Sequence, residues 1–413
     1  MDDSRRKKIE TLLDLHRVDD AQEQLMSLAA ENPDDAWVFG QMCRCHLIKG
    51  EHGKALEQAN KVVANLPDSG WGHYLRGICL SNMDIHPSKA DEAFREALSN
   101  EPYEPAYYGA FAAHMLDSSK QEEALELAEK GLALDPEHEQ CQIVRMAVAS
   151  IRGKKGEAAD IGRGLLGDSP DSPDVHAQVG WTALRAGDHK QARGHFCTAL
   201  NLDPEHNNAR VGLVTSIKAT NPVYRLLLGW IFLCQRLGNY ALVVIFGIII
   251  IRRTLGEISE ANPELAMVLQ PVSWLLGLFV LLTWVGDPVA NFLLLLHPDG
   301  RHALTPQQKW SSSVVFGCLA GALALAIMGL SGKSDFTVQA LILASFSILA
   351  SAGLTHDFKE KQARTSGFMA LGVFVLGLAA LFLGGVNPGL LSLYLLAFIG
   401  FTWFGGILSV VRR

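Results

Sequence analysis

Residues 1–204 carry the spaced apolar positions of amphipathic helices, whereas residues 222–413 consist mainly of long apolar runs. In the first part the pattern recurs about every 34 residues. Each period contains an alanine and, twelve residues later, a proline. The alanines are Ala21, Ala55, Ala90, Ala124, Ala158 and Ala192, and the prolines are Pro33, Pro67, Pro102, Pro136, Pro170 and Pro204. A fixed period of this size predicts an array of repeats, each of which is one folded element.

The sequence of each period predicts two helices joined by a tight turn. The proline ends the second helix, because it lacks an amide hydrogen and its ring clashes with the preceding turn. Gly50 and Gly187 stand where the first helix must stop and the chain must reverse. The third repeat has one extra residue, either before Trp71 or in the turn 82–87, so its first helix has two registers that differ by one position.

The sixth repeat carries the most complete pattern, with Gly180, Ala192, Phe196, Ala199 and Pro204 at positions 8, 20, 24, 27 and 32. This set resembles the tetratricopeptide repeat (TPR), and the resemblance covers residues 2–204. It implies six pairs of antiparallel helices stacked into a solenoid. We expect domains at 1–204 for the repeats and at 205–221 for a capping helix and linker, because a terminal repeat must shield its neighbour's apolar face from water.

The resemblance also implies a concave groove, lined by the first helix of each repeat, that receives an extended or helical peptide from a partner protein. The groove positions predict a set of candidate residues: Trp37, Arg44, Tyr74, Gly109, Ala113, Trp181 and Arg185. One TPR subfamily binds chaperone C-termini through lysines and asparagines at positions 5 and 9. Here those positions hold residues such as Gly40 and Ala177, which argues against chaperone binding. Each tryptophan also fits packing between repeats.

Charge divides the chain in the same place as the hydrophobic pattern. Residues 1–221 carry 24 basic and 35 acidic residues, an excess of acid that does not suit nucleic acid and fits a protein partner better. The seven cysteines show no paired spacing, and we expect reduced thiols. No phosphate-binding loop, His-Glu-x-x-His motif or serine elbow is present. We therefore predict no catalytic residue, no metal site and no cofactor, and a protein that is not an enzyme.

The apolar runs predict a membrane domain over residues 222–413. Four runs have the length of about 20 residues that a bilayer requires: 311–330, 336–354, 367–385 and 390–410. A fifth, 268–285, ends at Gly286-Asp287-Pro288, where we expect a separate helix over 289–296. Arg236 interrupts the first apolar region, so we divide that region into an interfacial helix at 222–236 and a span at 237–251. The total is six spans, or five if 224–251 is a re-entrant hairpin.

The expected fold class is therefore all-α: an N-terminal TPR solenoid of six repeats followed by a multi-span transmembrane bundle. The chain opens without the apolar core of a signal peptide, and the distribution of lysine and arginine between the loops places the repeats in the cytoplasm. We expect an integral protein of the bacterial inner membrane, whose partners are a protein peptide or helix, the lipid bilayer and other membrane subunits.

Two functional hypotheses follow from this organisation. In the first, the protein is a membrane-anchored scaffold or adaptor that binds a partner in the groove of its repeats. In the alternative, it is a subunit of a membrane transport or assembly complex, and the repeats regulate its helical bundle. An intramembrane enzyme is the third and weakest hypothesis, because ionisable residues do not cluster in the apolar runs.

Overall fold

The computed structural model describes residues 2–15, 17–83, 87–237, 240–295 and 306–329, together with the short stretches 373, 375–377, 393–394 and 397. The chain divides into two compact units, of which the first ends at Thr182 and the second begins at Ala183. Helix α11 (Pro173–Ala186) contains the division.

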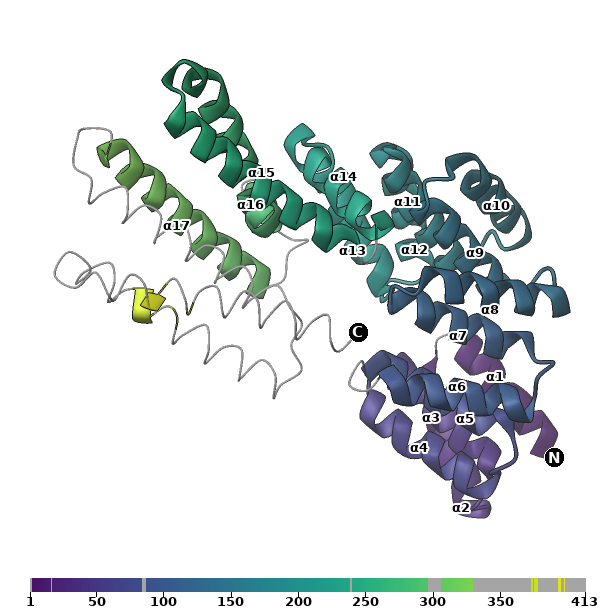
Figure 1. The fold of residues 1–413 in the computed structure, drawn as a ribbon. Coiled ribbons are helices and arrows are strands. Elements are labelled where there is room, and N and C mark those ends of the chain that lie inside the picture. The colour runs from purple at the N-terminus through teal and green to yellow at the C-terminus, as the bar shows by residue number, and fades with distance from the viewer. Residues whose placement is uncertain are drawn as a thin grey trace. The chain divides into compact units, whose positions relative to one another are not determined.

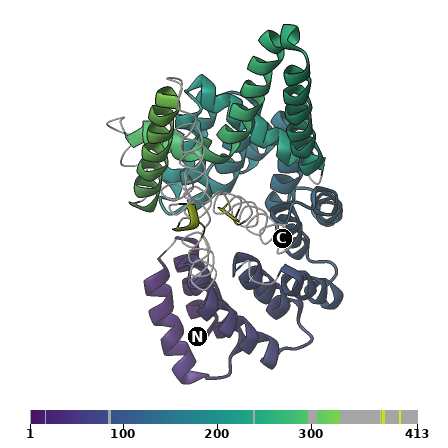
Figure 2. The same cartoon turned by 60° about the vertical axis from the view of Figure 1, so that its left-hand side comes forward.

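The first unit is a succession of helix pairs (Figures 1 and 2). Its helices are α1 (Asp2–Asp14), α2 (Val18–Glu31), α3 (Ala36–Ile48), α4 (His52–Asn65), α5 (Gly70–Met83), α6 (Pro87–Asn100), α7 (Pro105–Asp117), α8 (Gln121–Leu134), α9 (Glu139–Ile151), α10 (Lys155–Asp168) and the start of α11. Helices α1, α3, α5, α7 and α9 each pack against the helix that follows, and the first helices α3, α5, α7 and α9 also contact one another in order. This arrangement confirms the predicted helical repeats.

The second unit continues with six further helices among the described residues. They are α12 (His189–Leu202), α13 (Asn207–Lys218), α14 (Pro222–Leu237), α15 (Tyr240–Ala261), α16 (Pro263–Leu295) and α17 (Pro306–Gly329). Of these, α15, α16 and α17 are the longest. Helix α13 is the helix expected after Pro204, and it packs on α12 so closely that a Cβ at Gly212 would lie 2.3 Å from the ring of Phe196. The later helices pack in sequence, α15 on α16 and α16 on α17.

The repeating alanines form the tightest points of the core. All six, from Ala21 to Ala192, are completely buried. Each lies near the start of a second helix, where a larger side chain would force the two helices of the pair apart. Phe94 and Phe196 are completely buried as well, and a Cβ added at Gly77 in α5 would lie 2.8 Å from Phe94. The small and large residues of the period therefore pack against each other as the resemblance implies.

The repeating prolines do more than end the second helices. Each lies two residues beyond the last helical residue, as expected. In five of the turns, a side chain six residues further on donates a hydrogen bond to the proline carbonyl. The donors are His73 to Pro67, Tyr108 to Pro102, Gln142 to Pro136, His176 to Pro170 and Arg210 to Pro204, at 2.8 to 3.2 Å. This bond ties the start of each first helix to the turn before it, since a turn carbonyl needs a partner.

Glycine allows the first helices to end. Gly50, Gly153 and Gly187 have φ angles of 70°, 77° and 96°, in the left-handed region where a residue without a Cβ is not strained. The fourth repeat has Ser119 at the same point, with φ of 61°. Among the described residues, Ser119 is the one residue other than glycine that has a positive φ angle.

The start positions of the helices locate the extra residue of the third repeat. Helices α3 and α5 begin at Ala36 and Gly70, with the regular spacing, whereas α4 and α6 begin at His52 and Pro87, one residue further apart. The insertion therefore follows the start of α5. Of the two alternatives, the structure excludes a residue inserted before Trp71, and it places Tyr74 at position 5 of its repeat.

Trp71 contacts both the second and the third repeat. Its ring covers Gly40, where a Cβ would lie 2.0 Å from the nearest ring carbon. Trp71 also packs against the buried cluster of Cys43, Ala55, Ala59, Val62, Leu75 and Cys79. This tryptophan packs between repeats, and the contact requires glycine at position 40.

The predicted transmembrane bundle is wrong. Among the helices in the described residues, none combines the length and the apolar character needed to cross a bilayer. The apolar runs 237–251, 268–285 and 311–330 lie in α15, α16 and α17, and the interfacial helix expected at 222–236 corresponds to α14. Helix α15 runs on into the polar segment from Arg252 to Ala261, and α17 begins with the polar residues 307–309. The prediction of an integral membrane protein is overturned by the same finding.

Two further parts of that prediction have different outcomes. The break expected at residues 286–288 is absent, because α16 continues through Pro271 and Pro288 to Leu295, so the separate helix at 289–296 is also wrong. The expected spans 336–354, 367–385 and 390–410 lie outside the described residues, apart from the short stretches named above. Apolar runs predict helices, but these helices pack on one another, as the stacked rings of Phe292 and Phe316 show at 3.9 Å.

Replacing Gly40 with alanine tests the packing of Trp71. We expect Gly40→Ala to lower the free energy of unfolding by about 2 kcal/mol, because the new methyl group overlaps the indole ring and the packed core resists the shift. The matched control is Gly164→Ala in α10, where a Cβ meets nothing within 4 Å, so helix propensity alone should raise stability by about 0.5–1 kcal/mol. Urea denaturation followed by circular dichroism measures both. Equal effects of the two substitutions would contradict the packing argument.

Ser119 gives a second test, of opposite sign. Ser119→Gly should raise the free energy of unfolding by about 0.5–1 kcal/mol, because the left-handed conformation strains a residue with a Cβ. The converse change, Gly153→Ser, should lower it by a similar amount. Thermal unfolding of the two variants should therefore shift in opposite directions, and a lower melting temperature for Ser119→Gly would contradict the interpretation.

Candidate functional site

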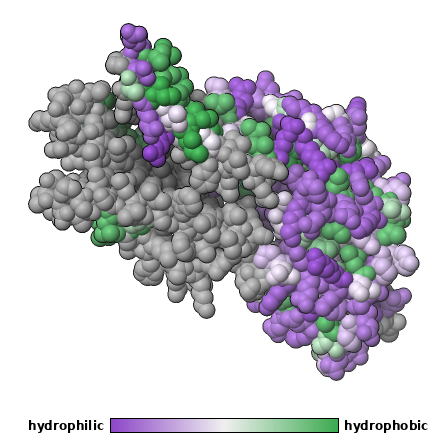
Figure 3. Space-filling view, in the orientation of Figure 1, coloured by the Kyte–Doolittle hydropathy of each residue, from purple (hydrophilic) through white to green (hydrophobic). Residues whose placement is uncertain are grey.

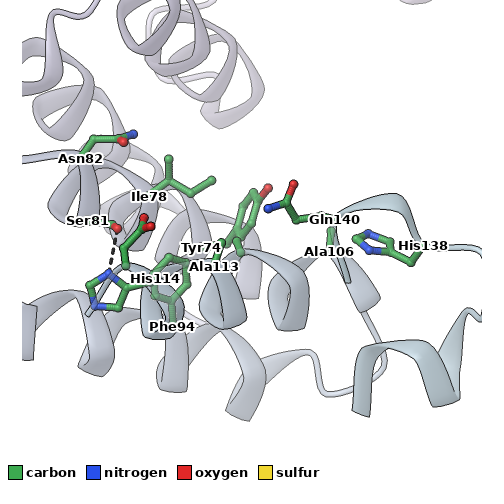
Figure 4. Close-up of a pocket in the computed structure, with 12 residues that line it drawn as sticks. Tyr74, Ile78, Ser81, Asn82, Phe94, Ala106, Ala113, His114, His138 and Gln140 are labelled. Atoms are coloured by element: carbon green, nitrogen blue, oxygen red, sulfur yellow. Dashed lines mark hydrogen bonds between the residues drawn. The ribbon is translucent and has the colours of Figure 1, made fainter. Parts of the chain in front are cut away.

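The first helices of the third, fourth and fifth repeats line an open cavity of about 410 Å³, here called the α5–α7–α9 cavity (Figure 4). It lies wholly within the first unit. Its lining consists of Tyr74, Ile78, Ser81, Asn82, Phe94, Ala106, Ala110, Ala113, His114, Asp117, His138 and Gln140. Three of these, Ala106, Ala110 and Ala113, recur at helical spacing along one face of α7, so small side chains leave room above that helix.

The lining has two polar ends and an apolar middle. In Figure 4, Ser81, Asn82 and His114 gather at one end, and Ala106, His138 and Gln140 at the other. Tyr74 and Ile78 lie between them. The first end is built from the last turns of α5 and α7, and the second from the first turns of α7 and α9.

Contacts with Tyr107 fix the position of the Tyr74 ring. Its ring stacks on Tyr107 at a centroid distance of 4.8 Å, and the Tyr107 hydroxyl donates a hydrogen bond to Glu101 at 2.7 Å. The Glu101 carboxylate also accepts from the amide of Gly70 and the hydroxyl of Ser69, at the start of α5. Burial raises the pKa of Tyr74, so its hydroxyl stays protonated at neutral pH. Tyr74 is thus a fixed, neutral aromatic wall.

A chain of hydrogen bonds runs behind the Ser81 end and joins three helices. His114 Nδ1 lies 2.8 Å from the Ser81 hydroxyl, and His114 Nε2 lies 2.9 Å from the Asp91 carboxylate. Lys120 Nζ lies 3.3 Å from the other oxygen of Asp91. His114 is buried, with 6% of its side chain exposed. Because these atoms come from α5, α6 and α7, the chain fixes the third repeat to the fourth.

The opposite end is shaped by His138, which caps the start of α9. Its Nδ1 accepts a hydrogen bond from the amide of Cys141 at 3.4 Å, a capping role usually taken by serine or aspartate. A Cβ at Gly109 would lie 3.0 Å from His138 Cε1 and 3.2 Å from Gln140 Cβ. Gly109 therefore lets α9 approach α7 closely at this end of the cavity.

The structure brings some of the predicted groove residues together and separates others. Tyr74 and Ala113 line the cavity, and Gly109 lies under its His138 end. Trp37 and Arg44 lie on α3, outside the lining. Trp37 packs between repeats, since Arg6 stacks over its ring at 5.0 Å. Arg44 donates a hydrogen bond to Gln41 at 3.0 Å.

The last two candidates, Trp181 and Arg185, lie on α11 and do not contribute to this cavity. Trp181 is half-buried. Arg185 stacks over Phe232 of α14 at 5.3 Å. Its Nε and Nη1 atoms are buried without a hydrogen-bond partner in the described part of the chain, and burial lowers the pKa of Arg185 to about 10. The guanidinium of Arg185 is therefore a largely buried cation in the second unit, although the residue as a whole is half-buried.

The cysteines add no reactive site. All seven are free thiols, and Cys43, Cys45, Cys79 and Cys141 are completely buried. Burial raises the pKa of Cys45 to about 11. The hydrogen bond with Cys43, at 3.5 Å between sulfurs, and burial raise the pKa of Cys79. The thiols of Cys45 and Cys79 therefore stay protonated at neutral pH, and the buried cysteines pack as small apolar groups. In the described ranges, no group of three or more His, Cys, Asp and Glu side chains is arranged to hold a metal ion.

The predicted groove residues do not include the polar side chains at the two ends of the cavity. Ser81, Asp117 and Gln140 occupy positions 12, 13 and 2 of their repeats, which usually face the groove, but they were not among the candidates. His114 and His138 occupy other positions, and their hydrogen-bond partners lie 3 to 33 residues away in the sequence. One signal was present: polar side chains at the last turn of α5 and the first turn of α9 interrupt otherwise apolar first helices.

Helix pairs whose first helices contact one another in order define an all-α helical repeat fold. No known family model and no curated protein matches the chain.

Solved structures that resemble the chain are TPR proteins. One is a tetratricopeptide repeat protein from Parabacteroides merdae, with 14% sequence identity and a TM-score of 0.44 over 52% of this chain and 83% of that one. YrrB, described as a TPR protein with an unusual peptide-binding site, has 16% identity and a TM-score of 0.30, covering 45% of this chain and 95% of its own. PilW, a type IV pilus biogenesis factor, has 16% identity and a TM-score of 0.38, covering 50% and 93%. The likeness is one of helical arrangement.

Arg185 generates a prediction about the second unit. Arg185→Met keeps an unbranched side chain against Phe232 and removes a buried charge whose Nε and Nη1 lack partners in the described residues. We expect it to raise the free energy of unfolding by about 1 kcal/mol, because a buried charge without compensation destabilises the folded state. Arg185→Lys, which keeps the charge, should not be stabilising. Differential scanning calorimetry compares the two, and a large loss of stability in Arg185→Met would show that the guanidinium is compensated.

Proposed function

We propose that this protein is a scaffold that binds a peptide or helix of a partner protein in the α5–α7–α9 cavity. The single observation that carries the proposal is the cavity itself, which lies on the first helices of consecutive repeats and is floored by the alanine face of α7. Its volume accommodates one or two side chains rather than a folded domain.

The character of the lining supports a peptide ligand. The middle of the cavity offers Tyr74, Ile78 and the alanines for apolar contact, and the two ends offer side chains that form hydrogen bonds. Apolar contact with a few convergent polar groups is typical of sites that hold a flexible segment in one register. Trp71 and Trp37 are engaged between repeats, so the ligand surface is centred on Tyr74.

The other functional hypotheses are not retained. A regulated membrane bundle and a membrane-anchored scaffold both depended on spans that the described helices do not provide. The proposed function therefore concerns the repeats alone, as a binding module and not as an enzyme.

Filling the cavity tests the proposal. The full chain is used to select from a random dodecapeptide phage library, and the enriched peptides are synthesised. We expect Ala113→Phe to weaken their binding at least tenfold, because the ring occupies the space above α7. The matched control is Ala133→Phe on α8, an exposed alanine outside the lining, which should bind normally. Fluorescence anisotropy measures the dissociation constants.

Circular dichroism of both variants shows whether Ala113→Phe remains folded. If the folded Ala113→Phe variant binds every enriched peptide as tightly as the unchanged protein does, the cavity is not the binding site. The proposal also fails if the library yields no enriched peptide.

A further inference from the structure

We propose that the Ser81 end of the α5–α7–α9 cavity is a subsite for a basic side chain, so that the bound partner segment places a lysine or arginine there against Asp117 and Ser81. This inference rests on the proposed function, since it specifies the ligand of the same cavity. Four features of the described residues carry it: the direction of the Ser81 proton, the carboxylate of Asp117, the ends of two helices and the charge of the surrounding repeats.

The hydrogen-bond chain behind the cavity determines which way the Ser81 hydroxyl points. A carboxylate accepts hydrogen bonds and does not donate them, so His114 Nε2 must carry the proton shared with Asp91. In the neutral imidazole, His114 Nδ1 is then an acceptor, and Ser81 donates its only proton to it at 2.8 Å. The remaining lone pairs of Ser81 Oγ are left for the cavity. Ser81 therefore offers a ligand an acceptor and no donor.

Asp117 places a negative charge at the same end. It is the one carboxylate among the described residues that line the cavity, and it is exposed to solvent. A carboxylate has about four acceptor positions, so Asp117 can bind a ligand ammonium or guanidinium group in addition to its contacts inside the protein. Together, Asp117 and Ser81 present acceptors to a ligand that must supply donors.

Helix geometry adds to this polarity. Ser81 and Asn82 lie in the last turn of α5, which ends at Met83, and Asp117 is the last residue of α7. The C-terminal ends of both helices therefore meet the cavity at this end. The carbonyl groups of a helix C-terminus carry partial negative charge and favour a nearby cation.

The repeats around the cavity are strongly acidic. Between residues 101 and 150 the chain has ten aspartates and glutamates and three lysines and arginines. The face of the repeat helices shown in Figure 3 is mainly hydrophilic. The negative charge is therefore exposed to solvent and attracts a basic segment over several ångströms. Two positive charges lie near the cavity: Lys120, which pairs with Asp91 at 3.3 Å behind the Ser81 end, and Arg44, which acts on Tyr74 toward the middle of the cavity and hydrogen-bonds Gln41.

The middle of the cavity suits the stem of such a side chain. Ile78, Ala110 and Ala113 provide apolar contact for the methylene groups of lysine or arginine, while the charged head remains at the wetter Asp117 end. The Tyr74 ring gives a further wall on which a basic side chain can pack. A lysine or arginine thus matches the site along its whole length.

Sequences selected by the unchanged full chain from the random dodecapeptide library give the first test. We expect a lysine or arginine at one common position among the peptides whose binding Ala113→Phe blocks. If those peptides share no basic position, this inference is wrong while the proposed function stands. If Ala113→Phe blocks none of them, the proposed function itself has failed.

Matched synthetic peptides give the second test. One carries the selected lysine and the other norleucine in its place. The unchanged protein should prefer the lysine peptide about tenfold, and Asp117→Asn should reduce this preference to about twofold without weakening the norleucine peptide, because the substitution removes charge and preserves shape. Ser81→Ala should reduce the preference less, since it removes one acceptor.

The control variant is Glu129→Gln on α8, which removes one negative charge outside the cavity lining. It should leave the lysine preference close to tenfold. Equal losses in Asp117→Asn and Glu129→Gln would show that only the overall charge matters and would overturn the subsite. A preference that survives Asp117→Asn unchanged would overturn it as well.

Discussion

One fully buried alanine in each repeat sets the distance between paired helices, and the remaining structure of the repeats depends on that distance. From Ala21 to Ala192 the side chains have no exposed surface. Adding even a few methylene groups at such a point forces side chains from their preferred rotamers and moves the backbone. Because every pair meets at the same small contact, successive pairs have the same geometry and their first helices come to lie side by side. A cavity shared by α5, α7 and α9 requires that regularity.

The contacts between repeats are more varied than the contacts within them. Trp71 covers Gly40, Arg6 stacks on Trp37, and Gln140 lies against Gly109, so the second position of one first helix repeatedly meets the fifth position of the preceding one. A large side chain at one of these two positions packs against a small or flexible side chain at the other. The fold accepts many pairs at this contact, and the choice of pair decides whether a space remains. In the fourth repeat the second position is Ala106, which leaves the ring of Tyr74 facing a cavity.

Much of the repeat fold could be predicted from the sequence because its constraints are local. Ala55 and Pro67 lie in one helix and the turn after it, and Gly50 ends the helix before, so spacing alone reveals them. The bond from His73 to the Pro67 carbonyl was not foreseen, since the donor is histidine, tyrosine, glutamine or arginine in different repeats and only its distance from the proline is constant. The apolar helices beyond Pro222 show a different limit. Hydrophobic runs indicate that helices will be buried, but they do not distinguish lipid from another helix as the covering surface.

The polar lining of the cavity could not be predicted because the hydrogen bonds that determine its polarity join residues of three helices. Ser81 alone is a serine near a helix end, and its hydroxyl could donate or accept. Ser81 presents an acceptor to the cavity because its hydroxyl donates its hydrogen bond to His114 Nδ1. Nδ1 can accept this bond because the hydrogen bond to Asp91 keeps the imidazole proton on Nε2. Each link joins a different helix, so the polarity of one surface atom depends on the stacking of two repeats. The alanine contact that sets the helix spacing therefore also determines, through a buried histidine, what kind of group the cavity can bind.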